Sequence, residues 1–267
     1  MGFYDQPSPP EVQHGNWNQW LAERPQIPYL VPFLVFVAIG FVPAKFLGHT
    51  GGIDWQRVWF TYHPVVYASK TVAGALLLVL CWKYYTPIRW RNLGLGVLVG
   101  LAGVPLWVGL EYLSQRVGFG HPPSPTDPYA IYNPLVQIPD ANWRLLFYII
   151  RVGGPTLVVP IMEELFFRDF IMRFLVRGAR FQDVEVGAFD RRNMFSWFSL
   201  LGMCLLFGIN HIQQPSGFAY GLLMGVLLIR TKSLGACIVA HGVTNIVLYV
   251  FVIYQGTMGN GWYWQFM

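Results

Sequence analysis

A few polar residues in the apolar second half of the chain have types and spacings that could support hydrolysis. Glu163 and Glu164 are adjacent within the run PIMEELFFRDF, and Arg168 follows Glu164 by four residues. Residues four apart lie on one face of a helix, so Arg168 can pair with Glu164 and keep that carboxylate ionised. Ionised groups inside an apolar helix cost roughly 2.5–3.5 kcal/mol each on membrane-insertion scales, which indicates a use for them.

Two further pairs of residues at helical spacing accompany the carboxylates. Phe207 and His211 are four residues apart, and so are His241 and Asn245. A carboxylate beside an imidazole can hold and deprotonate a water molecule. A second imidazole and an amide can donate hydrogen bonds to a developing oxyanion. In lipid, the polar faces of the three helices should turn toward one another, so we expect one constellation.

The same residues leave a second chemistry open. No Ser or Cys lies in a nucleophile motif such as G-x-S-x-G, which disfavours a covalent mechanism. Glu163, His211 and His241 could instead bind zinc, although the motif H-E-x-x-H is absent. Hydrolysis with or without a metal therefore remains possible from the residues alone.

The composition predicts that a membrane surrounds these residues. The chain has 267 residues, of which 54% are hydrophobic and 12% are charged, whereas soluble domains carry about 25% charged residues. We therefore expect an all-α, polytopic transmembrane bundle of about seven or eight membrane helices. The net charge of +5 is typical of basic cytoplasmic loops, such as residues 83–91 and 177–192, and does not indicate nucleic-acid binding. The three cysteines show neither metal-ligand spacing nor a disulfide framework.

The apolar runs give the expected elements. Residues 1–27 form a polar tail with a short helix near 17–21, and residues 28–267 form one membrane-embedded domain. The predicted spans cover residues 25–44, 58–82, 93–113, 143–160, 194–212, 218–229 and 234–254, with a further helix over 161–176. The pattern does not decide whether 143–176 is one kinked helix or two, because glycines and prolines precede the carboxylates.

Some other features of the spans predict packing rather than chemistry. Gly96, Gly100 and Gly103 form a small-residue face that suits close helix contact. Asp169 lies one helical turn before Arg173, so we interpret the pair as charges on a helix surface. His63, Lys70 and Glu111 are interpreted as structural or interfacial residues.

Three short motifs occur in order on separate apolar segments and resemble those of a known family. E-E-x-x-x-R spans Glu163–Arg168, F-x-x-x-H spans Phe207–His211, and H-x-x-x-N spans His241–Asn245. The set resembles the CPBP family of intramembrane proteases, which includes type II CAAX prenyl endopeptidases and bacteriocin-processing proteins. The run PIMEELFFRDFIMRFL also resembles a bacterial branch of that family found beside exosortase protein-sorting systems.

The resemblance implies an intramembrane endopeptidase with a catalytic core at about residues 143–254 of a conical helical bundle. Glu163 and His211 would activate water, and His241 and Asn245 would form the oxyanion hole. The supporting residues would be Glu164, Arg168 and Phe207.

The resemblance further implies no cofactor and a peptide or membrane-protein substrate within the lipid bilayer. The expected location is the bacterial inner membrane, while the oligomeric state stays open. Two alternatives remain: a zinc metalloprotease with His211, His241 and Glu163 as ligands, and a non-enzymatic membrane protein that serves in immunity or assembly.

Overall fold

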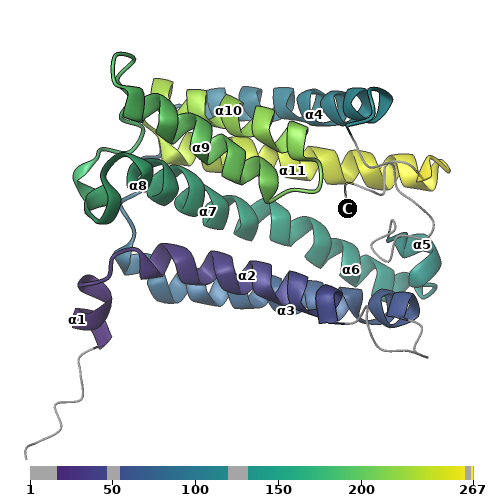
Figure 1. Ribbon diagram of the computed structural model, residues 1–267. Coiled ribbons are helices and arrows are strands. Elements are labelled where there is room, and N and C mark those ends of the chain that lie inside the picture. Colours follow the sequence, from purple (N-terminus) through teal and green to yellow (C-terminus); the bar gives the residue numbers. More distant parts are fainter. Residues whose placement is uncertain (1–16, 47–54, 120–131, 262–265, 267) are drawn as a thin grey trace, which may run out of the picture.

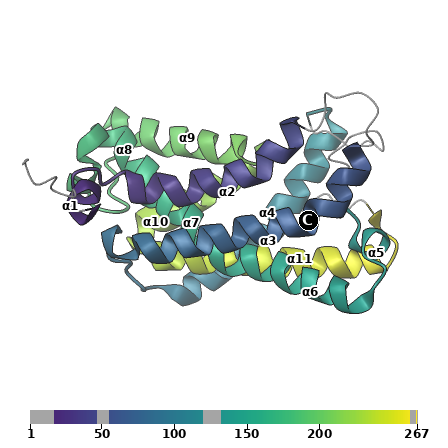
Figure 2. The same cartoon turned by 90° about the horizontal axis from the view of Figure 1, so that it is seen from below.

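The computed structural model describes residues 17–46, 55–119, 132–261 and Phe266, and these residues form an all-helical bundle. No β-strand occurs within the described residues, which confirms the predicted all-α class. The long helices run along one common direction in the view of Figure 1, and Figure 2 shows that one of them, α4 (Leu93–Arg116), crosses the others obliquely.

The long elements are mostly continuous α-helices. A short helix, α1, lies at Trp17–Ala22, where one is predicted. The other helices are α2 (Ile27–Phe46), α3 (Trp55–Cys81), α4 (Leu93–Arg116), α5 (Pro134–Gln137), α6 (Ala141–Gly153), α7 (Val159–Glu163), α8 (Met172–Arg177), α9 (Met194–Ile209), α10 (Gln214–Thr231) and α11 (Leu234–Thr257).

Four of the described helices are long and apolar enough to cross a membrane. They are Thr61–Tyr84, Leu93–Arg116, Ala141–Asp183 and Leu234–Thr257. Two shorter apolar helices cover Ile27–Gly40 and Met194–Ile209. The helical membrane fold is thus supported, while the predicted number of seven or eight spans stays a prediction.

Residues 141–177 form one continuous helix, which answers the question that the sequence pattern leaves open. Asp140 caps its first turn by accepting hydrogen bonds from the N–H groups of Asn142 and Trp143 at 3.0 and 2.9 Å. Two wider π-helical stretches, η2 (Gly154–Val158) and η3 (Glu164–Ile171), interrupt the α-helical turns. The helix ends at Gly178, whose φ of +58° suits glycine.

The glycine face of α4 brings α11 close, as predicted. A Cβ atom at Gly100 would lie only 2.5 Å from the carbonyl oxygen of Ala240, and one at Gly96 would lie 2.6 Å from that of Ala236. The Thr244 hydroxyl donates to the Gly100 carbonyl at 2.8 Å. Because only hydrogen fits at these α4 positions, α11 is held at a fixed depth, and with it the two polar residues that it carries.

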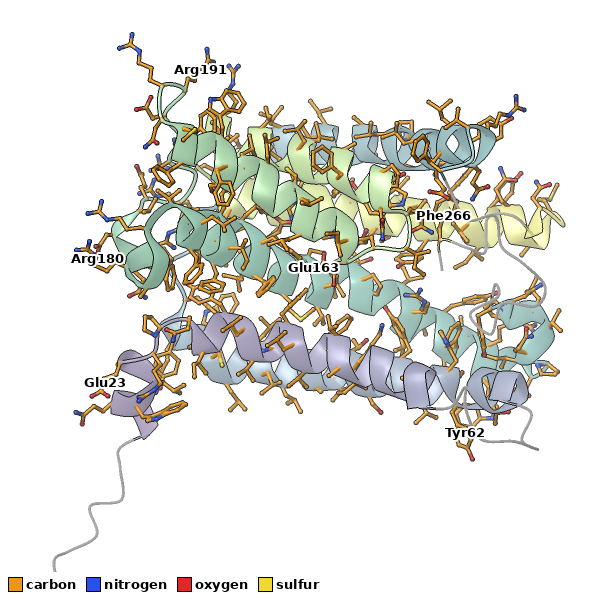
Figure 3. All side chains as sticks on the ribbon, in the orientation of Figure 1. Glu23, Tyr62, Glu163, Arg180, Arg191 and Phe266 are labelled. Carbon is orange, nitrogen blue, oxygen red and sulfur yellow. The ribbon has the colours of Figure 1, made fainter. Side chains whose placement is uncertain are left out.

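The basic loops gather at one end of the bundle. Arg89, after α3, forms an ion pair with Glu185 at 2.8 Å, and Lys232, after α10, donates to the Gly187 carbonyl. Figure 3 shows Arg180 and Arg191 at this same end, Tyr62 toward the opposite end, and Glu163 between them.

Candidate active site

The continuous helix of residues 141–177 places the two glutamates in different surroundings. Glu163 ends α7, and Glu164 begins the π-helical stretch η3. Consecutive residues on a helix point about 100° apart, so one carboxylate can face a cavity while the other faces the packed interior. π-helical turns inside α-helices are frequent at functional sites.

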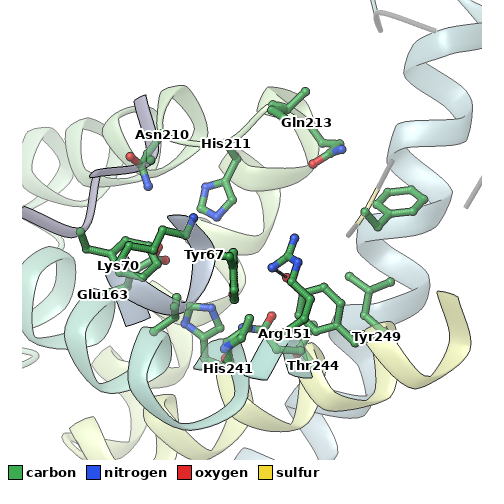
Figure 4. Close-up of a pocket in the computed structure, with 18 of the residues that line it drawn as sticks. Tyr67, Lys70, Arg151, Glu163, Asn210, His211, Gln213, His241, Thr244 and Tyr249 are labelled. Atoms are coloured by element: carbon green, nitrogen blue, oxygen red, sulfur yellow. Dashed lines mark hydrogen bonds between the residues drawn. The ribbon is translucent and has the colours of Figure 1, made fainter. Parts of the chain in front are cut away.

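Glu163 faces a cavity of about 380 Å³ inside the bundle. Its side chain is buried, and within the described residues its Oε2 atom has no hydrogen-bond partner. Figure 4 shows Glu163, His211 and His241 around the same space. A buried carboxylate oxygen without a protein partner is available to a water molecule or a substrate in the cavity.

Glu164 lies in the packed interior and does not line the cavity. Its Oε1 atom accepts a hydrogen bond from Nη1 of Arg168 at 3.1 Å, as the spacing predicts. The same oxygen lies 2.9 Å from Nδ1 of His241. The side chains of Glu164 and Arg168 are fully buried. The contact with His241 is not predictable from spacing, because the two residues are 77 positions apart.

His211 lies in the turn after α9, and its hydrogen bond defines its tautomer. Its Nδ1 atom is 2.7 Å from the carbonyl oxygen of Phe207. Since a carbonyl oxygen can only accept, Nδ1 must carry the hydrogen, and in the neutral ring Nε2 holds the lone pair. Because His211 also lines the cavity, this arrangement suits an imidazole that accepts a proton from water.

The side chain of Asn245 is oriented by a carbonyl group that the π-helical turn leaves unpaired. The N–H of Val159 bonds to the carbonyl of Gly154, five residues earlier. The corresponding partner of the Pro155 carbonyl would be the nitrogen of Pro160, which carries no hydrogen. That carbonyl instead accepts from Nδ2 of Asn245 at 2.7 Å. The second N–H of the amide remains available to the cavity, which Asn245 lines.

The Phe207 ring packs against both imidazoles. Its ring centroid lies 4.5 Å from that of His211 and 6.2 Å from that of His241. The guanidinium of Arg168 lies over the same ring at 4.3 Å. The ring centroid of Trp107, on α4, lies 5.1 Å from that of His211. Phe207 therefore contacts the guanidinium of the ion pair and both histidines.

The structure brings all four predicted catalytic residues to one cavity: Glu163, His211, His241 and Asn245. It also adds residues that the sequence motifs miss, namely Tyr67 and Lys70 of α3, Arg151 of α6 and Tyr220 of α10. Lys70 and His63, interpreted from the sequence as structural or interfacial, also line this cavity. The signal that could have found Lys70 and Arg151 is the presence of a cation within a predicted span.

The zinc alternative finds no matching ligand group in the described part of the chain. There, no three His, Cys, Asp or Glu side chains are grouped as ligands of a metal ion would be. Nδ1 of His211 and Nδ1 of His241 are both engaged with protein oxygens. These contacts leave Nε2 of each ring as the atom that could bind a metal. We derive no chemical step through a metal.

The fold and the cavity together define a multi-pass integral membrane protein with an enzyme-like polar site inside its helices. The family comparison then agrees with the resemblance noted in the sequence. The family model described as Type II CAAX prenyl endopeptidase Rce1-like matches residues 143–247. Residues 143–247 are thus similar to this protease family, and the match covers the four predicted catalytic residues. A search of curated proteins and a search of solved structures each found no match.

Proposed function

We propose that the protein is an intramembrane endopeptidase that hydrolyses a peptide bond with water activated by Glu163 and His211. The observation that carries this proposal is the position of Glu163, a buried carboxylate that lines the same cavity as His211, whose Nδ1 is held by the Phe207 carbonyl. The cavity volume of about 380 Å³ suits a short stretch of peptide, since ligand sites commonly occupy roughly 300–1,000 Å³.

The first step forms the bond between water and the peptide carbonyl. Water held between Glu163 and Nε2 of His211 gives up one proton to this pair as its oxygen attacks the carbonyl carbon. General-base catalysis of this kind contributes typically about 10²–10⁴-fold in rate. The proton then passes to the leaving nitrogen as the C–N bond breaks, leaving one carboxylic acid and one amine.

The second component is stabilisation of the oxyanion that forms on the carbonyl oxygen. Asn245 offers the N–H that does not bond to the Pro155 carbonyl. His241 offers Nε2, which donates when the ring is protonated. The Glu164 carboxylate accepts a hydrogen bond from Nδ1 at 2.9 Å and so orients the ring. Removing one oxyanion donor typically lowers kcat about 10²–10³-fold.

The test compares buried carboxylates inside and outside the cavity. Purified protein in detergent is incubated with a library of peptides, and cleavage products are identified by mass spectrometry. Glu163→Gln and His211→Ala should each abolish cleavage. Glu111→Gln is the matched control, because Glu111 is a buried carboxylate of α4 that does not line the cavity. Unchanged turnover in Glu163→Gln or His211→Ala would refute the mechanism.

Two further measurements distinguish this mechanism from the zinc-dependent and the non-enzymatic alternatives. Stoichiometric zinc by elemental analysis, together with activity that a chelator removes and zinc restores, would replace this mechanism with a metal-dependent one. Full complementation of a deletion phenotype by Glu163→Gln would show that the cellular role needs no proteolysis.

The proposal also includes an orientation in the bacterial inner membrane. Basic loops favour the cytoplasmic side, so the end that carries Arg89, Arg180 and Arg191 would face the cytoplasm. A cysteine placed at Arg191 should then be protected in intact cells from a thiol reagent that cannot cross the membrane.

A further inference from the structure

The lining of the cavity also carries two cations. Lys70 of α3 and Arg151 of α6 both line the cavity, whereas Glu163 is the one carboxylate among the described lining residues. Counting His as neutral, the lining therefore has one positive charge in excess. Figure 4 shows Lys70 beside Glu163, and Arg151 beside Tyr249.

The rings of two tyrosines form cation–π contacts with these cations. The guanidinium carbon of Arg151 lies 4.2 Å from the ring centroid of Tyr67 and 5.1 Å from that of Tyr249. Nζ of Lys70 lies 4.7 Å from the same Tyr67 ring. Both cations contact the Tyr67 ring, and their positive charges repel each other.

Arg151 lacks the carboxylate that normally accompanies an arginine inside a membrane. Within the described residues, neither Arg151 nor Lys70 forms an ion pair at 4.0 Å or less. Nη1 of Arg151 donates to the Tyr249 hydroxyl at 3.3 Å, while Nε is buried and has no described hydrogen-bond partner. Cation–π contacts stabilise a guanidinium, but they do not neutralise its charge.

We propose that Arg151, with Lys70 beside it, forms an anion-binding subsite that takes a carboxylate of the bound peptide, either its C-terminus or an acidic side chain. A carboxylate matches the single positive charge in excess and the planar fork of donors on a guanidinium. This inference deepens the proposed function, because it rests on a peptide occupying the same cavity.

A binding experiment tests the subsite without requiring turnover. The protein carries His211→Ala, which blocks cleavage and leaves the charge of the cavity unchanged. Two rhodamine-labelled apolar peptides are titrated in detergent by fluorescence anisotropy. The carboxylate peptide has a free C-terminus and one internal Asp, and the amide peptide has an amidated C-terminus and Asn in place of that Asp. We expect the carboxylate peptide to bind about tenfold more tightly, as one charge-assisted hydrogen bond would produce.

Variants then assign the preference to Arg151. Adding Arg151→Gln should weaken the carboxylate peptide about tenfold and leave the amide peptide within twofold, whereas Arg151→Lys should retain part of the preference. Arg116→Gln is the matched control, since Arg116 is exposed, also lies over a tyrosine ring at 4.7 Å, and does not line the cavity. Equal binding of both peptides, or an equal loss of both in Arg151→Gln, would overturn a peptide carboxylate as the ligand.

A competition experiment distinguishes a peptide carboxylate from a lipid phosphate as the bound anion. Short-chain phosphatidylglycerol and short-chain phosphatidylcholine are compared as competitors for the labelled peptide. Competition by phosphatidylglycerol that disappears in Arg151→Gln, with no preference between the peptides, would assign the subsite to a lipid phosphate. No dependence on Arg151 in either arm would refute an anion site. Carboxylate preference without any cleavage by the unmutated protein would leave the subsite standing and refute the proposed function.

Discussion

Two buried carboxylate–arginine pairs lie on one helix, one turn apart, and their surroundings differ. Glu164 pairs with Arg168 at 3.1 Å, and Asp169 pairs with Arg173. Both pairs have the i,i+4 spacing, and both carboxylates are 0% exposed. Spacing alone therefore does not distinguish the two pairs.

The hydrogen bonds around each pair differ. Among the described residues, Oε2 of Glu164 and both Nε and Nη2 of Arg168 are buried without a partner. In the second pair, the Tyr29 hydroxyl donates to Asp169 at 3.0 Å. Arg173 donates to the Val184 carbonyl at 2.7 Å and to the Thr86 hydroxyl at 3.0 Å. The sequence interpretation of Asp169 as a surface charge is wrong, because helix α2 and the loops after α3 and α8 cover it.

The protein tolerates incomplete hydrogen bonding beside the cavity, at the Glu164–Arg168 pair. The Asp169 pair joins three segments at the basic end of the bundle, which suits a purely structural role. The Glu164 pair contacts His241 and the Phe207 ring beside the cavity, and its unsatisfied atoms are the kind found at functional sites. Three substitutions would break or sharpen this distinction.

The largest expected effect is on stability, in Asp169→Asn. This change leaves Arg173 charged and without its buried partner, which typically costs about 3–5 kcal/mol. Thermal unfolding in detergent should show a clearly lower midpoint, while cleavage per folded molecule stays near that of the unmutated protein. Tyr29→Phe is the graded control and should cost about 1.5–3 kcal/mol, because it removes one hydrogen bond to a charged group. A catalytic defect at equal folded fraction would contradict a structural role.

The next effect is on catalysis, in Glu164→Gln. The amide preserves an acceptor for Arg168 but replaces the carboxylate that accepts from Nδ1 of His241 and orients this oxyanion donor, so kcat should fall about 10²–10³-fold. KM for the same peptide should change little, because Glu164 does not line the cavity. Kinetics at equal folded fraction measure both quantities. A change confined to the unfolding midpoint would make the two pairs equivalent and remove the distinction drawn above.

The smallest effect is expected for Phe207→Leu. Leucine keeps an apolar side chain but loses the contact with the Arg168 guanidinium, which is worth about 0.5–2 kcal/mol. The imidazoles of His211 and His241 also lose the ring against which both pack, so their positions become less precise. We therefore expect roughly a tenfold lower kcat with a small loss of stability. Phe167→Leu is the matched control, since Phe167 packs against Phe207 at 5.1 Å without lining the cavity. Equal kinetic effects of the two changes would show general loosening of the core.

The sequence alone predicts several features of this protein from residue spacing and composition. The low charge content predicts a membrane bundle, the i,i+4 rule predicts the Glu164–Arg168 pair, and the α4 glycines predict a close helix contact. The polar residues of the second half also predict a shared site, because lipid forces such groups inward. Each of these inferences depends on a period or a composition, which the chain displays directly.

Only the tertiary structure decided which faces meet. The contact between Glu164 and His241, the Pro155 carbonyl that holds Asn245, and the position of Lys70 and Arg151 in the cavity join segments far apart in the chain. The burial of Asp169 has the same origin, since its cover comes from Tyr29 and Thr86. A helical period defines a face of one helix, but the partner of that face depends on how all the helices pack together.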